Sequence, residues 1–64
     1  MTADATEYGQ VVSVRGGVVD VHFPRQLPHV NHLLTTGGGN DILLEVALHL
    51  DERHVRAVAL TPTR

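Results

Sequence analysis

The sequence favours an all-β fold, and two observations lead to that fold class. Several short runs are rich in β-branched residues and alternate between apolar and polar positions, which is the pattern of half-buried strands. Glycine-rich or proline-rich segments separate these runs, as is typical of turns between strands. The chain has 64 residues, so we expect one small domain with a thin core.

The composition excludes several classes of protein. The chain has no cysteine, and therefore no disulfide and no thiolate metal ligand. Its net charge is −2 and it lacks lysine, whereas nucleic-acid binders and polybasic membrane-surface segments carry basic patches. No apolar run approaches the roughly 20 residues of a transmembrane helix, and the first ten residues lack the features of a signal peptide. We therefore expect a cytoplasmic chain with no nucleic-acid partner and no direct membrane insertion.

A β-hairpin is the first element that the sequence predicts. Residues 1–8 are polar and without period, and we expect a flexible tail there. Val11–Arg15 and Val18–Phe23 alternate at period two, and Gly16 and Gly17 join them. Glycine adopts positive φ without strain, so the pair is interpreted as a structural two-residue turn.

The hairpin has one register that separates its two faces. In that register Arg15 lies opposite Val18, Val14 opposite Val19, Val12 opposite Val21 and Gln10 opposite Phe23. The apolar face then contains Val12, Val14, Val19, Val21 and Phe23. The other face contains Ser13, Arg15, Asp20 and His22, together with Val11 and Val18. A shift by one residue would mix the faces, so the sequence specifies the pairing.

The middle of the chain contains a connection, a short strand and a loop. Pro24 and Pro28 bracket a segment that is predicted to be an extended connection, because proline is excluded from the interior of a sheet. Val30–Thr36 is interpreted as a short strand. The Gly37–Asp41 segment, with the sequence GGGND, is predicted to be a loop.

The run from Asp41 to Leu60 fits two structures. At period two, alternate residues from Ile42 to Leu50 are all apolar, and His54–Leu60 also favours a strand. At helical period, Glu45, His49, Glu52 and Arg56 form a polar stripe with Asp41 as an N-cap. Periodicity alone does not distinguish these structures. Two strands joined by a solvated turn at Asp51–Arg53 are favoured, and a helix is the alternative.

No segment has the pattern of a catalytic, phosphate-binding or metal site. A phosphate-binding loop needs a lysine and a following helix, and neither glycine-rich segment has them. His29 and His32 are three residues apart, with His22 as a further candidate ligand, but no rigid element holds them in the geometry that zinc requires. We expect no catalytic residue, no cofactor-binding residue and no metal ligand in these 64 residues.

Four segments together resemble a known family. GQVVSVRGGVVDVHF, LPHVNHLL, ILLEVALHL and VRAVALTPT occur in the order and spacing of the N-terminal domain of the F-type ATP synthase beta subunit. The resemblance runs from Gly9 to about Thr63. LDERHVRAVALTPT is especially similar to the divergent, sodium-coupled bacterial branch of that family. Gly17 stands where relatives commonly have alanine or serine, so only Gly16 is expected to need positive φ.

The resemblance implies a fold and a function. The fold is a small closed antiparallel β-barrel of about six strands over residues 9–64, as a fragment of a longer chain, with Ile42–Leu50 and His54–Leu60 as strands. Ile42, Leu44, Val46 and Leu48 are then expected to pack inside with the apolar face of the hairpin. The function is that of a crown domain that stabilises the alternating alpha–beta catalytic ring at the cytoplasmic face of the bacterial inner membrane.

The resemblance also implies partners and interface residues. The partners are the neighbouring barrels of alpha subunits, and the isolated domain is expected to self-associate. Polar interface candidates are Asp20, Arg25, Glu45 and Arg56. ATP or ADP and Mg²⁺, and proton or sodium coupling, belong to the intact subunit and its complex, which synthesises or hydrolyses ATP, and none of that chemistry lies in this fragment. A free-standing OB-like binding module and a compact α/β regulatory protein with a helix at 41–53 are the alternatives.

Overall fold

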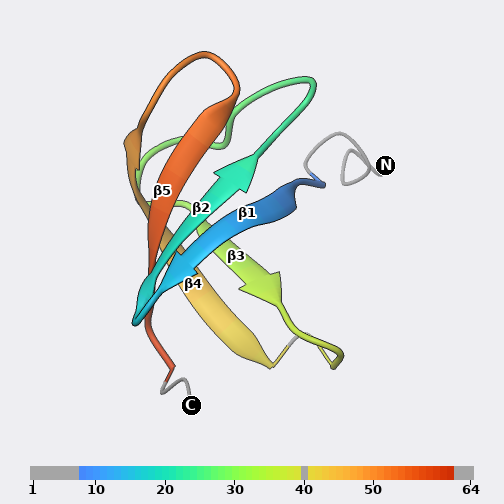
Figure 1. The fold of residues 1–64 in the computed structure, drawn as a ribbon, viewed down its shortest axis with the longest axis vertical. Coiled ribbons are helices and arrows are strands. Elements are labelled where there is room, and N and C mark those ends of the chain that lie inside the picture. Colours follow the sequence, from blue (N-terminus) through green and yellow to red (C-terminus); the bar gives the residue numbers. More distant parts are fainter. Residues whose placement is uncertain (1–7, 40, 62–64) are drawn as a thin grey trace.

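The molecule is built of β-strands (Figure 1). A computed structural model describes residues 8–39 and 41–61. The strands are β1 (Gln10–Arg15), β2 (Val18–His22), β3 (Leu33–Thr36), β4 (Ile42–His49) and β5 (His54–Ala59). The helical alternative over 41–53 is therefore wrong, and the two predicted strands with a turn between them are confirmed. In the part of the chain that is described, no helix is long and apolar enough to cross a membrane.

The strands form one antiparallel sheet with the order β1-β2-β5-β4-β3, curled into a half-barrel (Figure 1). The predicted all-β antiparallel architecture is confirmed, with five described strands where about six were expected. Strands β1 and β3 are the two edges, and no Cα atom of one lies within 8 Å of the other. Since paired strands are about 4.8 Å apart, these edges are not hydrogen-bonded to each other. A groove of about 250 Å³ lies between them, and its lining includes Val11, Phe23 and Leu34.

The core lies on the inner face of the curled sheet. It comes mainly from β2, β4 and β5 and consists of Val19, Val21, Phe23, Leu44, Val46, Val55 and Ala57. Leu27, Leu34, Ile42 and Ala59 pack against it. Alternation along each strand produces this face, as expected for a sheet that is covered on one side.

The hairpin turn forms as the sequence predicts, but the pairing of β1 changes within the strand. Gly16 has a φ of +60° and Gly17 lies outside the left-handed region, which confirms that only the first glycine needs positive φ, as in a type II′ turn. Arg15 and Val14 pair with Val18 and Val19 as expected, but a bulge at Val12 then shifts the register.

Because of this bulge, Val11 lies opposite Val21 and Gln10 opposite His22, and the predicted partners Val12 and Phe23 are displaced. The expectation that Val12 and Val14 pack inside is also wrong, since their exposed fractions are 54% and 61%. Strand β1 is an edge of the sheet, so none of the strands within residues 8–39 and 41–61 covers the inner-facing side chain of Val14.

A second bulge, at Ala47 in β4, changes the face of the residues that follow. Val46 pairs with Ala57, but the next pairs are Leu48 with Arg56 and His49 with Val55. Leu48 therefore lies on the outer face with 45% of its surface exposed, which corrects the expectation that it packs inside. The imidazole Nε2 of His49 lies 2.7 Å from the carbonyl oxygen of Pro28 and ties β4 to the long connection.

The connections agree broadly with the sequence. Residues 24–32 link β2 to β3 without forming a strand. Asn31 has a φ of +75°, so the chain turns there and the strand expected over Val30–Thr36 begins only at Leu33. Residues 1–7 of the predicted tail lie outside the described residues, and Tyr8 is exposed.

Candidate interaction surface on the outer face

The outer face of the sheet brings together side chains from all five strands. On β2 and β5 it consists of the residues that alternate with the core, and the register continues this face onto β1, β4 and β3. One row across the sheet is Arg15, Val18, Val58, Glu45 and Leu33, and a second is Ser13, Asp20, Arg56 and Leu48. These nine residues are called the outer face below.

Asp20 and Arg56 form an ion pair at the centre of the outer face. They lie directly opposite each other on β2 and β5. The guanidinium donates from Nε to Oδ1 at 2.9 Å and from a terminal nitrogen to Oδ2 at 3.1 Å. This two-point geometry fixes both side chains more firmly than a single contact does. The exposed fractions of the two side chains are 15% for Asp20 and 36% for Arg56.

The pair shifts the protonation of both partners. The hydrogen bonds and charge of Arg56 hold the pKa of the Asp20 carboxyl below its ordinary value of 3.8, although partial burial opposes this shift. The carboxylate in turn raises the pKa of the Arg56 guanidinium. Both groups are therefore ionised at neutral pH, and their charges largely cancel within the outer face.

Apolar side chains surround this neutralised pair. Val58, Leu48 and Leu33 are 42%, 45% and 56% exposed, and Val18 is half-buried. At the centre of the outer face the charges are paired and the exposed side chains are aliphatic, so this centre loses little solvation when a second surface covers it, while the charged Arg15 and Glu45 lie in the adjacent row. The outer face can therefore pack against another protein, and it contains no arrangement of groups suited to covalent chemistry.

The four predicted interface residues do not all lie together. Asp20 and Arg56 form the central pair, and Glu45 lies in the adjacent row between Val58 and Leu33. Arg25 is exposed in the bend after β2, outside the strands. Gly16 and Gly17 form the turn at the end of the hairpin, next to Arg15 and Val18 of the first row.

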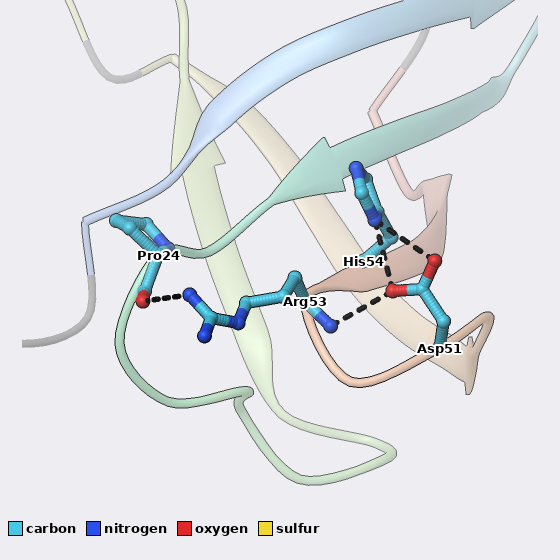
Figure 2. Close-up of polar contacts among 4 residues, drawn as sticks. All are labelled: Pro24, Asp51, Arg53 and His54. Atoms are coloured by element: carbon cyan, nitrogen blue, oxygen red, sulfur yellow. Dashed lines mark hydrogen bonds and ion pairs between the residues drawn. The ribbon is translucent and has the colours of Figure 1, made fainter.

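The β4–β5 turn carries polar contacts that sequence reasoning did not find (Figure 2). The backbone NH of Arg53 donates to Oδ1 of Asp51 at 2.8 Å, and the Arg53 guanidinium donates to the carbonyl of Pro24 at 2.8 Å. His54 Nδ1 lies 2.9 Å from Oδ1 of Asp51. The bond from the Arg53 backbone, followed by that from His54, lowers the pKa of the Asp51 carboxyl.

These contacts hold the β4–β5 turn against the end of β2. The carbonyl of Arg53 also accepts a hydrogen bond of 2.7 Å from the backbone NH of Phe23. An aspartate side chain that accepts a hydrogen bond from the backbone NH two residues later is a common turn motif. The sequence Asp51-Glu52-Arg53 is the local signal for this motif. The long-range bond to Pro24 has no comparable local signal.

Comparison with known proteins gives a consistent set of relatives. Residues 11–64 match the model of the ATP synthase alpha/beta family, beta-barrel domain. The chain is 54% identical over 56 residues to ATP synthase subunit beta 2 of Shewanella frigidimarina, covering 88% of this chain and 12% of that protein.

Two further relatives align over all of this chain. Identity is 48% over 64 residues with ATP synthase subunit beta 2 of Syntrophotalea carbinolica, of which 14% is covered. It is 50% over 64 residues with ATP synthase subunit beta 2 of Polaromonas naphthalenivorans, of which 13% is covered. The chain thus spans 12–14% of the length of these three relatives.

Proposed function

Because the chain belongs to the ATP synthase alpha/beta family and matches its β-barrel domain, we propose that it acts as the N-terminal domain of a beta subunit. Its role is to pack beside the equivalent domains of alpha subunits and so to stabilise the alternating alpha–beta ring of a rotary ATP synthase. The match over residues 11–64, which includes nearly all of the five-stranded sheet, carries this proposal.

The outer face supports an assembly role for this domain. The charges at its centre are paired between Asp20 and Arg56, and exposed Val58 and Leu48 flank that pair. Packing against another barrel would bury the aliphatic side chains at roughly 25 cal/mol for each Å² of apolar surface removed from water. The ion pair would remain satisfied within the chain, so neither of its two charges would be left unpaired in the interface.

The groove between β1 and β3 supports a barrel that one further strand would complete. Among the described strands, the outer edges of β1 and β3 have no strand partner, and they face an apolar floor that includes Val21, Phe23 and Leu44. One further extended strand, placed between the edges, would satisfy both sets of backbone groups and cover that floor. In the intact subunit, we expect such a strand to complete the barrel of about six strands.

ATP chemistry belongs to the rest of the intact subunit in this proposal. The chain contains no lysine, which a phosphate-binding loop of the common type requires. Binding of ATP or ADP with Mg²⁺, and coupling to proton or sodium flow, would lie with other domains and subunits. The complex would sit at the cytoplasmic face of the bacterial inner membrane, with this domain as a peripheral part.

Binding to an alpha-subunit barrel tests the proposal directly. The chain is titrated with the isolated N-terminal domain of an alpha subunit from the same organism, and the complex is detected by analytical ultracentrifugation. Val58→Glu places a charge in the outer face and is expected to abolish binding. Val30→Glu is the matched control, since Val30 is similarly exposed at 46% but lies in the β2–β3 connection. Equal binding by wild type and Val58→Glu would refute the assignment of the outer face.

An OB-like nucleic-acid module is tested by a separate titration with a single-stranded oligonucleotide. Binding of single strands relies on exposed aromatic rings in a positively charged groove. The chain has one tyrosine and one phenylalanine, and Phe23 is only 2% exposed. We expect no binding of a single-stranded oligonucleotide at physiological salt, and measurable binding would favour the OB-like alternative.

A further inference from the structure

Two histidines that are far apart in the sequence face each other on the sheet. His22 ends β2 and His54 begins β5, and the two residues are direct partners in the antiparallel register. Their ring centroids are 4.9 Å apart and their planes are inclined at 47°. Neither residue is fully exposed, and the paired strands fix both backbones. The two rings therefore have a defined relative position, unlike a pair of histidines on a loop.

Asp51 determines which nitrogen of His54 is free. Its two carboxylate oxygens lie 2.9 and 3.1 Å from Nδ1 of His54. An ionised carboxylate only accepts hydrogen bonds, so Nδ1 carries the proton and Nε2 of the neutral ring keeps its lone pair. Figure 2 shows the second ring nitrogen of His54 pointing away from Asp51. This is the arrangement by which a carboxylate orients a histidine that binds a metal through its other nitrogen.

We propose that His22 and His54 form a two-histidine chelate for a divalent late transition-metal ion, with Asp51 orienting His54. Metal–nitrogen bonds to imidazole are about 2.0–2.1 Å long, so two nitrogens on one ion lie no more than about 4.2 Å apart. Rings whose centroids are 4.9 Å apart can bring one nitrogen each to that separation.

The ligand set indicates which ions the site accepts. Within residues 8–39 and 41–61, no group of three or more histidine, aspartate or glutamate side chains is arranged to hold a metal. Two imidazoles would therefore share the ion with water. Imidazole nitrogen suits copper, nickel and zinc, and affinity for a given nitrogen site is highest for Cu²⁺. Mg²⁺ and Ca²⁺ prefer oxygen ligands and are not expected to bind here.

A second histidine pair in the chain provides a matched control. The rings of His29 and His32 have centroids 5.9 Å apart, and both residues lie in the connection before β3. Among the hydrogen bonds of the described residues, no carboxylate contacts either of these rings, whereas Asp51 contacts His54. If two nearby imidazoles were sufficient for metal binding, the His29/His32 pair would bind the ion as well as the His22/His54 pair does.

Titration of the 64-residue chain with CuCl₂ and NiCl₂ at pH 7.5, followed by calorimetry, tests the site. One ion is expected to bind per chain and to raise the melting temperature. His22→Asn and His54→Asn should each weaken binding at least about 10-fold, since one imidazole ligand is lost. Asp51→Asn keeps both rings and should weaken binding about 10- to 100-fold, as loss of such an orienting partner typically does. The double variant His29→Asn/His32→Asn should bind like wild type.

Two further measurements keep the result unambiguous. Circular dichroism establishes whether each variant is folded. If His54→Asn does not fold, Asp51→Asn takes its place as the variant that tests this side of the site. Electron paramagnetic resonance of the Cu²⁺ complex should show coupling to two imidazole nitrogens, and to fewer in His22→Asn. Binding that persists in His22→Asn, or that is lost in the His29/His32 double variant, would overturn the proposal, and so would the absence of Cu²⁺ binding to wild type.

Discussion

The ring of Phe23 lies directly over Gly9, so close that no side chain fits between them. A Cβ atom placed on residue 9 would lie 2.7 Å from Cε1 of Phe23. Phe23 is 2% exposed and is among the largest fully buried side chains of the core. Gly9 precedes β1, so this contact fastens the beginning of the edge strand to the floor of the groove.

Gly9→Ala is therefore expected to destabilise the domain. The new methyl group meets the buried ring rather than a flexible side chain, so either Phe23 or the chain before β1 must move. Overpacking of this kind typically costs about 1–3 kcal/mol. Urea unfolding monitored by circular dichroism measures the loss. A combined Gly9→Ala/Phe23→Leu variant should lose less than the sum of the two single variants, and simple additivity would contradict the contact.

The two turn glycines are expected to respond in opposite directions to alanine. A Cβ atom on Gly16 or Gly17 meets nothing within 4 Å, so only the backbone conformation distinguishes them. Gly16→Ala forces alanine to a φ near +60° and should cost about 1–2 kcal/mol. Gly17→Ala should stabilise by about 0.4–1 kcal/mol, because it restricts the unfolded chain. Thermal unfolding of the two variants gives both signs, and equal effects would rule out the turn geometry described here.

The Asp20–Arg56 pair is expected to make stability depend on pH in the acid range. The folded-state pKa of Asp20 is lowered from 3.8, so the unfolded state binds the proton more tightly. The contribution is complete above the ordinary aspartate pKa and is lost as the pH falls through the folded-state value. Asp51, whose pKa is also lowered, contributes in the same direction.

Unfolding free energy measured between pH 6 and pH 2 tests this expectation. Wild type should lose stability on acidification, and Asp20→Asn should lose less, so that the two curves converge at the acid end. Asp51→Asn is the companion variant for the second carboxylate. Wild-type and Asp20→Asn curves that run parallel across this range would show that the pair makes no contribution to folding.

Much of the fold follows from local sequence, and the exceptions have a common cause. Turn chemistry at Gly16 and alternation in Val18–Phe23 are local features, so the hairpin and its turn were predictable. The bulges at Val12 and Ala47 were not predictable. Each bulge adds one residue to its strand, and the alternation of apolar residues in the sequence shows no interruption at that point. In a strand, one extra residue reverses the face of everything beyond it. That reversal exposes Leu48, and it does so where the sequence pattern predicts a buried leucine.

The candidate site shows the same division between local and long-range information. Asp20 and Arg56 were both expected at an interface, but their pairing depends on the register between β2 and β5. His22 and His54 lie together for the same reason. The spacing of histidines along the sequence instead indicates His29 and His32, which are three residues apart. Spacing along the chain indicates sites on one element, and these two pairs form between elements.

The bulge in β4 leads to a final prediction about two leucines on the same strand. Period-two alternation assigns Leu44 and Leu48 to one face, but Leu44 is 1% exposed and Leu48 is 45% exposed. Leu44→Ala removes buried methyl groups and should cost about 2–5 kcal/mol. Leu48→Ala lies on the outer face, where substitutions usually change stability by no more than about 0.5 kcal/mol.

Parallel urea titrations of the two variants distinguish the bulged strand from a regular one. Leu44→Val provides a milder change if Leu44→Ala does not fold, and it should still destabilise more than Leu48→Ala. A regular strand would bury both leucines and give similar losses. Leu48→Ala should instead weaken binding to an alpha-subunit barrel domain, because its side chain borders the Asp20–Arg56 pair on the surface proposed for assembly.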